Sequence, residues 1–363
     1  MHHSINGAFA LSHPPQTWQR LGRIIERGMA GEFDASVTGD PCIVWDEAHE
    51  RYRMFYFAQK HVDGREVNAV GQALARSALD IGAGAWYKLG PLAYVNPDAL
   101  LGGAHKPWLL MDAYRPNVAV RLDGQYRLFV VSWRGSTKVI QMATAPSLDG
   151  PWQVQRQPVL DVGSGDAFDA YHVDTVTAFW FEARQQILLF YKGYPALAQP
   201  DQPRSPYGSG SAAAVMSPGD TVAHKLGKVL APSSLPGHWA GGWIGGLQIV
   251  PARRGGWYAL LNASPTPPPS PELSPIVREP APSLGGWAYT AEEWPVGGWQ
   301  MLARPIEWIE DIPESARQNG EGVNMWRHHL VVSDNKLYLF YNSGPYGQER
   351  MFGRCSDKEP AVT

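Results

Sequence analysis

Two stretches of the sequence have the same design. They are "FDASVTGDPCIVW", from Phe33 to Trp45, and "FDAYHVDTVTAFW", from Phe168 to Trp180. In each, Phe-Asp-Ala leads within a few residues to a second aspartate and then to an apolar run. Self-similarity of this kind is the mark of a repeat architecture, in which each copy is one unit of a larger assembly. The fold therefore depends on how many further copies the chain contains.

Five segments share one shape, which is an apolar strand, a polar turn and an aromatic-rich strand. Two β-rich runs around a short loop of Asp, Gly, Asn or Arg predict a β-hairpin. A third strand of small residues follows each hairpin. The five hairpins are "PCIVWDEAHERYRMFYFA" from Pro41, "NVAVRLDGQYRLFVVSW" from Asn117, "TVTAFWFEARQQILLFYKG" from Thr175, "LQIVPARRGGWYALLNAS" from Leu247 and "HLVVSDNKLYLFYNSG" from His329.

Five units of roughly 55–80 residues, with about four strands each, predict a five-bladed β-propeller. This is an all-β fold in which four-stranded antiparallel blades surround a central channel. The 38 glycines and 31 prolines agree with it, because they mark many turns between short elements. We expect a single domain with blades over residues 34–101, 102–165, 166–235, 236–315 and 316–363, the last closed by the N-terminal segment.

Composition excludes several classes of partner. The 363 residues are 44% hydrophobic and carry a net charge of −3, so nothing in the charge favours nucleic acid or an anionic membrane. Two cysteines, Cys42 and Cys355, do not make a disulfide framework. The N-terminal stretch lacks the basic segment of a signal peptide, and no apolar run approaches the ~20 residues that span a bilayer. We therefore expect a cytoplasmic protein, with no oligomeric state specified.

The propeller fold predicts where functional residues meet. The innermost strand of each blade lines the channel, and the second strand returns to the same end. Two long loops, Pro195–Gly210 and Ser264–Gly286, leave second strands and would overhang that mouth. The residues expected to converge there are Asp34, Asp40, Arg115, Asn117, Asp169, His172, Asp174, Trp239, Trp243, Glu321, Asn324, Trp326, Arg327, His328 and His329.

Carboxylates, arginines, histidines and flat aromatic rings around a pit are what a sugar site needs. Carboxyl groups serve as acid and base, and tryptophan faces stack on sugar rings. The first aspartates of the repeated pair, Asp34 and Asp169, are expected to be turn residues with local hydrogen bonds, and the second ones, Asp40 and Asp174, to do chemistry. The expected substrate-binding residues are Arg115, Asn117, Trp243, Trp326, Arg327 and His328.

Several motifs resemble one family. "GDPCIVWDEAHERYRMFYFA" resembles the first blade of glycoside hydrolase family 43 and its five-bladed relatives, "HVDTVTAFW" resembles their third-blade start, and "SLDGPW" (147–152) is similar to an outer-strand signature of the group. The resemblance covers the whole chain as architecture. It implies that Asp40 is the base that activates water, and that Asp174 tunes the pKa of the acid and orients the substrate.

The chain departs from that family in the fourth blade. The family has a glutamate there as general acid, whereas this sequence has "GGWIGGLQIV" with Gly245 and Gly246 at about the matching place. Two residues are candidates to replace it. His172 lies two residues before Asp174, on the same face of a strand, and Glu321 precedes the fifth blade. The acid being absent altogether is a further alternative.

The sequence thus predicts a glycoside hydrolase that cleaves short oligosaccharides or glycosides of arabinofuranoside, xyloside or galactoside type with inversion. One alternative is a carbohydrate-binding propeller without catalysis. Another is a glycoside phosphorylase, in which Arg115, Arg327 and His328 would hold phosphate. No metal or cofactor is expected in the reaction; related propellers hold a water or Ca²⁺ on the channel axis, so a Ca²⁺ ion near the adjacent pair His328 and His329 stays open.

Overall fold

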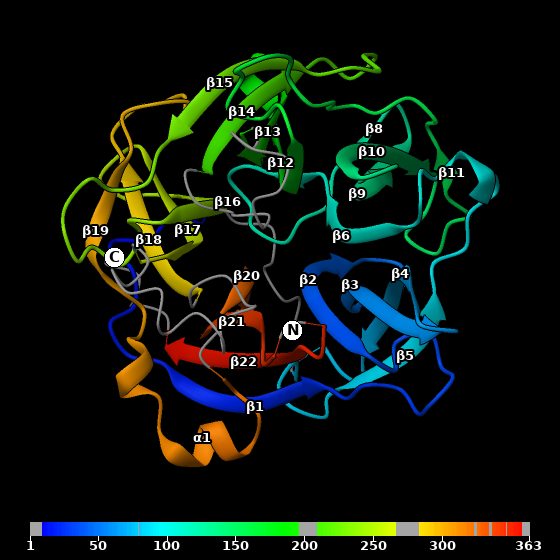
Figure 1. Ribbon diagram of the computed structural model, residues 1–363, viewed down its shortest axis with the longest axis horizontal. Helices are drawn as coiled ribbons and strands as arrows, with labels where there is room; N and C mark the ends of the chain where they lie inside the picture. Colours follow the sequence, from blue (N-terminus) through cyan, green and yellow to red (C-terminus); the bar gives the residue numbers. More distant parts are fainter. Residues whose placement is uncertain are drawn as a thin grey trace.

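The computed structural model describes residues 9–78, 80–195, 209–265, 283–322, 325–333, 336–345 and 347–357. Five small antiparallel sheets are arranged around a centre, as Figure 1 shows down the channel axis. The predicted all-β, five-bladed propeller is confirmed. Within the described ranges no helix has the length and apolar character needed to cross a membrane. Apart from their ends, the two long loops fall outside the described residues, as does Asn324.

Blades one and two occupy the first part of the chain. Blade one orders its strands from the centre outward as they occur in sequence, and blade two carries the short β8 (Arg121–Leu122) against β9. A 3-10 turn, η1 (Pro97–Ala99), joins the two blades. From the innermost outward, their strands are β2 (Val37–Asp46), β3 (Arg51–Val62), β4 (Arg65–Ala75) and β5 (Trp86–Pro91), then β6 (Ala104–Leu109), β9 (Gln125–Arg134), β10 (Thr137–Ala145) and β11 (Gln153–Val154).

Blades three and four follow the same order. In blade three, β7 (Met111–Asp112) pairs in parallel with the innermost strand, and the turn η2 (Glu182–Arg184) lies between its first two strands. Their strands are β12 (His172–Phe181), β13 (Gln186–Tyr194), β14 (Gly210–Met216) and β15 (His224–Leu230), then β16 (Trp243–Pro251), β17 (Trp257–Ser264), β18 (Leu284–Thr290) and β19 (Gln300–Pro305).

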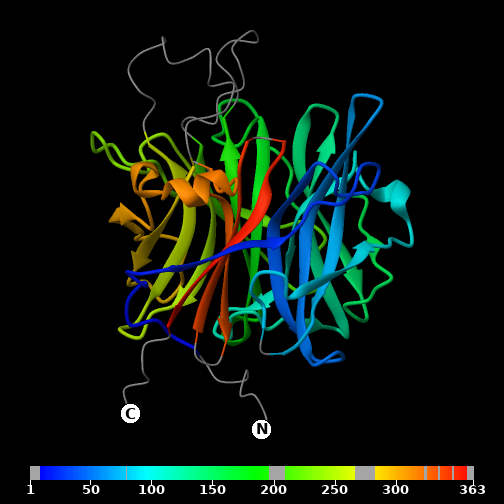
Figure 2. The same cartoon turned by 90° about the horizontal axis from the view of Figure 1, so that it is seen from below.

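Blade five joins the two ends of the chain. Its inner strands are β20 (Trp326–Ser333), β21 (Lys336–Ser343) and β22 (Arg350–Asp357), and its outer strand is β1 (Gln19–Ile25). Figure 1 shows β1 lying along β22, and Figure 2 shows the two strands from below, in dark blue and red. The turn η4 (Ile309–Asp311) and the short helix α1 (Glu314–Gln318) connect blade four to blade five. Pairing the N-terminal strand with the C-terminal one closes the ring without leaving the edge of β22 unpaired.

The predicted hairpin of blade two is wrong in its first strand. The segment after Asn117 does not line the channel; the innermost strand is β6, which carries the sequence "AHKPWL". The prediction passed over it because proline normally excludes a segment from the interior of a sheet. Pro107 is accommodated because β6 bulges between His105 and Trp108, where the ladder hydrogen bond is absent.

All five innermost strands bulge at the same place. The register shifts at Gly39/Cys42 in β2, and at corresponding positions in β6, β12, β16 and β20. A bulge turns a side chain away from its regular direction and is frequent beside active sites. Asp40, Lys106 and Thr175 occupy equivalent bulge positions, each with a positive φ between 45° and 53°. The bulges of blades one and two bring the side chains of Asp40 and Lys106 into the neighbourhood of Asp174.

Hydrogen bonds from side chains lock neighbouring innermost strands together below the bulges. The Leu109 amide donates to Cys42 Sγ (3.2 Å), Thr177 Oγ1 donates to the Leu247 carbonyl, and Gln248 exchanges two bonds with the backbone of Leu330. Each of these groups is buried, and a satisfied buried polar network specifies one arrangement of the strands. The inner strands thus form a rigid ring that holds the bulges in place.

Candidate active site

The first aspartates of the two repeated stretches lie in equivalent places. Asp34 accepts a hydrogen bond from the Tyr56 hydroxyl on the second strand (2.9 Å) and pairs with Lys88 on the fourth (2.6 Å). Asp169 accepts from Tyr191 (3.0 Å) and pairs with Lys225 (2.7 Å) on the same strands of its own blade. The carboxylate bonds to side chains rather than to turn backbone. Both carboxylates tie the turn before a blade to that blade's outer strand.

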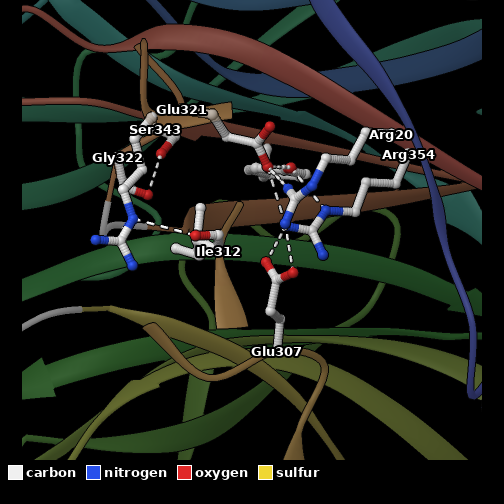
Figure 3. A network of polar contacts seen from close by, with 9 residues as sticks. Arg20, Glu307, Ile312, Glu321, Gly322, Ser343 and Arg354 are labelled. Carbon is white, nitrogen blue, oxygen red and sulfur yellow. Dashed lines mark hydrogen bonds and ion pairs between the residues drawn. The ribbon is translucent and has the colours of Figure 1, made fainter. Parts of the chain in front are cut away.

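Glu321 has the same environment in blade five. Figure 3 shows its carboxylate facing the guanidinium groups of Arg20 and Arg354, with Glu307 on the other side of both. The Tyr341 hydroxyl of the second strand donates to it (2.5 Å), and Arg20 comes from the fourth strand, β1. Glu321 therefore corresponds to Asp34 and Asp169 and lies in the blade-closing network. Its carboxylate is already bound by two guanidinium groups and a hydroxyl.

Asp40 is buried at the bulge of β2. Its amide donates to the Asn342 side chain (3.3 Å), but no described residue hydrogen-bonds or ion-pairs with its carboxylate. Burial raises the pKa of the Asp40 carboxyl, while the nearby charges of Lys106 and Arg327 oppose that rise. The result is a buried carboxylate whose oxygens remain available and whose ionisation depends on two neighbouring cations.

Asp174 is fully buried and lies one position before the bulge of β12. Lys106 Nζ contacts both of its oxygens at 2.9 and 3.0 Å, and Lys138 Nζ contacts one of them at 2.8 Å. Burial alone would raise the pKa of Asp174, but the two ammonium groups outweigh it and hold the pKa well below its usual range. Asp174 is therefore a permanent anion that orients two lysines.

The lysines of the site were missed in the sequence analysis. Lys106 comes from the overlooked strand β6, Lys138 from β10 and Lys192 from β13, so no local pattern joins them. One signal was present: "GDPC" and "HKPW" both place a charged residue before a proline on an innermost strand. That parallel aligns Lys106 with Asp40. Lys138, on the third strand of blade two, and Lys192, on the second strand of blade three, could be assigned to the site only from the tertiary structure.

Arg327 occupies the bulge of β20 and reaches across the channel. Its guanidinium donates to the carbonyls of Lys106 (3.2 Å), Pro107 (3.4 Å) and Val176 (2.5 Å), which belong to the bulges of blades two and three. It also lies 5.2 Å from the centre of the Trp108 ring. These contacts fix the inner strands and place a positive charge beside Asp40.

Trp243 and Trp326 are brought together. Their rings are parallel within 7° with centroids 5.9 Å apart, and Lys192 Nζ lies 3.7 Å from the centroid of the Trp243 ring. Trp243 is fully buried, whereas Trp326 is half-buried. Of the two rings, Trp326 has surface that a ligand could contact.

His172 lies beside this cluster. Its Nδ1 accepts a hydrogen bond from the amide of Lys138 (3.0 Å), so a neutral ring carries its proton on Nε2. Its ring is 5.7 Å from that of Trp133 in edge-on contact. Lys138 thus contacts both residues, because its backbone amide donates to His172 and its ammonium binds Asp174.

Glu349 is a further carboxyl near Asp40 that the sequence analysis did not single out. It precedes β22, and its carbonyl accepts from the amide of Thr38, two residues before Asp40 (3.3 Å). Its side chain is buried, and Oε2 has no hydrogen-bond partner among the described residues. Burial, with the charge of Asp40 adding to it, raises the pKa of Glu349 to about 7. Glu349 is therefore protonated below about pH 7 and ionises as the pH rises through that value.

Arg115 and Asn117 do not lie at the bulges, because the segment that carries them is not the innermost strand. Arg115 is paired with Asp112 (2.7 Å) in a partly exposed loop. Asn117 is buried and donates to the carbonyls of Ile43 and Leu330, joining blades one and five. Its positive φ of 68° is tolerated by asparagine, and its contacts are those of a structural residue.

The adjacent histidines point to different places, as alternation along a strand requires. His329 Nε2 lies 3.0 Å from the amide nitrogen of Asn117, and its ring packs on Trp108 near the channel. His328 packs against Gly285 and Tyr341 between blades four and five. Burial lowers the pKa of both to about 3, so both are neutral. Within the described ranges, no three His, Cys, Asp or Glu side chains are grouped as metal ligands.

Packing explains why glycines stand where family 43 has its general acid. A side chain at Gly245 would collide with Asn262, and one at Gly246 would collide with the carbonyl of Thr175 in the neighbouring bulge. A glutamate at Gly246 therefore requires movement of the backbone between blades three and four, and one at Gly245 requires the Asn262 side chain of the same blade to move.

Comparisons with known proteins give structural relatives only. No sequence family and no curated protein sequence matches the chain. Among solved structures, a complex of BT0996 with RGII superposes with a TM-score of 0.66 at 14% identity, over 95% of this protein and 94% of that one. A thermostable family-43 glycoside hydrolase gives 0.59 at 14% identity, with 94% of each protein covered.

A third relative comes from a study titled "The GH130 family of mannoside phosphorylases contains glycoside hydrolases that target beta-1,2 mannosidic linkages in Candida mannan". Its TM-score is 0.59 at 12% identity, over 95% of this protein and 96% of that one. The chain has the fold of the five-bladed propeller glycoside hydrolases. At these identities the similarity establishes the fold, and the chemistry must be argued from the residues of this chain.

Proposed function

We propose that this propeller is a glycoside hydrolase that acts on short oligosaccharides or glycosides with inversion, with Asp40 as the general base. One observation carries the proposal: a buried carboxylate with no partner among the described residues lies where the innermost strands bulge, beside two cations. The structural relatives, which include glycoside hydrolases, support it. Arabinofuranosides, xylosides and galactosides are the first substrates to test.

The proposed chemistry divides the work between the two aspartates. Asp40 takes a proton from the water that attacks the anomeric carbon, which requires Asp40 to be ionised and its oxygens to be accessible. Asp174 stays ionised because Lys106 and Lys138 bind it. Its role is to hold those ammonium groups against the substrate and beside Asp40, so that the base ionises in the pH range where the enzyme works.

An inverting reaction also needs a proton donor for the leaving oxygen, roughly 6.5–9.5 Å from the base. Glu321 is bound by Arg20 and Arg354, which leaves it poorly suited. Glu349 and His172 are the remaining candidates. Glu349 is favoured because its pKa of about 7 leaves a substantial fraction of it protonated at neutral pH, and the charge of its neighbour Asp40 contributes to that pKa.

The first experiment is hydrolysis of a panel of nitrophenyl glycosides, furanosides included, by the wild type and Asp40→Asn. Nitrophenol leaves with little protonation, so a weak acid would still register. Turnover by the wild type that is lost in Asp40→Asn supports the proposal. If neither protein shows turnover while the wild type binds sugars, the non-catalytic binding propeller is the correct function.

The proton donor is identified by comparing leaving groups. Glu349→Gln should retain activity on nitrophenyl glycosides and lose it on natural glycosides, whose alkoxide leaves only when protonated. With the natural substrate, kcat/KM of the wild type should fall above about pH 7, where Glu349 ionises. If His172→Asn shows this pattern and Glu349→Gln does not, His172 is the donor.

A second candidate function is favoured by the lysines of the site. Three lysines and Arg327 lie near Asp40 and Asp174, and such a group could hold inorganic phosphate as the nucleophile of a glycoside phosphorylase. The same panel is therefore run with and without phosphate. Release of a sugar phosphate only when phosphate is present would assign the phosphorylase function.

A further inference from the structure

Lys192 is the cation that the proposed reaction does not use. It lies on β13 directly opposite Asp174, and only 4% of its surface is exposed. Its ammonium lies 3.7 Å from the centre of the Trp243 ring and 4.5 Å from that of Tyr194. No carboxylate of the described residues lies within ion-pair distance of it. Lys192 is a buried ammonium held between aromatic rings.

The two aspartates of the site are already balanced without Lys192. Asp174 has two partners, Lys106 and Lys138, so this anion is more than compensated. Arg327 is the remaining cation beside Asp40. The positive charge of Lys192 is therefore in excess of what the aspartates of the site balance.

Burying an ammonium group is costly unless an anion pairs with it. Contact with an aromatic face offsets only part of this cost. Burial accordingly lowers the pKa of Lys192 well below its usual range, although Asp174 is nearby. A bound anion would stabilise the charged form, whereas a neutral sugar would not.

We propose that the site recognises an anionic sugar, in which a carboxylate of the uronic acid type pairs with Lys192 while the sugar ring lies against Trp326. The half-buried Trp326 stacks on Trp243, and the ammonium of Lys192 lies over Trp243, so the ring and the cation belong to one cluster joined by Trp243. The proposal rests on the proposed function in one respect, which is that the ligand is a carbohydrate. Inorganic phosphate is the other source of the same oxyanion chemistry.

The test is direct binding, which does not depend on turnover. Calorimetric titration of the wild type compares galacturonate with galactose, glucuronate with glucose, and inorganic phosphate with chloride at equal ionic strength. An acid should bind about tenfold or more tightly than its neutral parent, because a charge-assisted hydrogen bond in a buried site contributes that much. Lys192→Met should bring acid and parent to equal affinity.

Lys228→Met is the matched control, since Lys228 also lies over an aromatic ring, Phe168, but on the exposed strand β15. It should keep the preference for the acid. If only phosphate binds tightly, and Lys192→Met abolishes that binding, the oxyanion site is confirmed and its ligand is free phosphate.

The proposal is overturned if the wild type binds neither acid nor phosphate better than the neutral sugars, or if Lys192→Met keeps the preference. Should Lys192→Met fail to fold, the thermal midpoint of the wild type decides the question, since galacturonate or phosphate should raise it and galactose should not. A preference for acids without hydrolysis of any glycoside would contradict the proposed function and leave this inference standing.

Discussion

Blade one begins with Asp34 and Asp40, and blade three begins with Asp169 and Asp174. The first members of the two pairs are equivalent in every contact, since each has a tyrosine from the second strand and a lysine from the fourth. The second members are opposites. Asp40 has a raised pKa and no carboxylate partner among the described residues, while two lysines bind Asp174 and hold its pKa low.

The difference arises from a shift of one position along the strand. Asp40 occupies the bulge itself, where Lys106 and Thr175 stand in blades two and three, whereas Asp174 precedes its bulge. A bulge redirects a side chain, so adjacent positions point to different surroundings. Two stretches of similar design therefore place their second aspartates in different electrostatic surroundings.

The largest effect is expected from Asp40→Asn. As the general base it should contribute about 10²–10⁴-fold to kcat/KM, which would be lost with the ionisable group. Stability should not fall, because the native carboxylate is desolvated without a partner and the amide carries no charge to bury. Kinetics on nitrophenyl glycosides and a thermal melt check both. A large loss of stability would mean that Asp40, like Asp174, is a structural ion.

Asp174→Asn should behave differently. It leaves Lys106 and Lys138 without their anion in a buried place, and breaking a buried ion pair by removing one partner costs about 3–5 kcal/mol. Urea unfolding measures the change, with Asp40→Asn as the matched control for replacing a buried aspartate. If both variants unfold at the same urea concentration, the two aspartates do not differ in the way the contacts indicate.

Smaller and equal effects are expected at the first members of the pairs. Tyr56→Phe and Tyr191→Phe each remove one hydrogen bond to a buried carboxylate, so each should cost about 1.5–3 kcal/mol of unfolding free energy. Neither should change kcat/KM by more than about twofold, since each lost hydroxyl bonds to a first aspartate and not to a residue of the bulge. Unequal losses of stability would show that the two blades are less alike at this point than their contacts suggest.

Lys106→Met tests the link between the two second aspartates. Lys106 favours the ionised form of Asp40, so its removal should raise the pKa of Asp40 further. Because a general base must be ionised, the acid limb of the pH profile of kcat/KM should move to higher pH. Lys88→Met, which removes a lysine bound to Asp34 instead, should leave that limb in place.

The repeat could be recognised in the sequence because each blade must alternate apolar and polar residues in the same order to pack against its neighbours. Asp40 and Asp174 were singled out for the same reason, as they stand at the start of apolar strands in repeated units. One innermost strand, β6, was missed because it contains Pro107, and proline normally argues against a strand in the interior of a sheet. The ion pairs that make Glu321 a poor candidate for the acid were invisible, because Arg20 and Arg354 are remote from it in sequence.

The sequence by itself determined the five blades, the strand that closes the ring and the two aspartate pairs, because these follow from local periodicity and turn chemistry. Only the tertiary structure decided that Asp174 is neutralised by two lysines while the carboxylate of Asp40 has no partner among the described residues. That outcome depends on lysines from three different strands, on an arginine that crosses the channel and on a register shift of one residue. Charge–charge interactions act through space between residues far apart in the chain, and no local pattern encodes them.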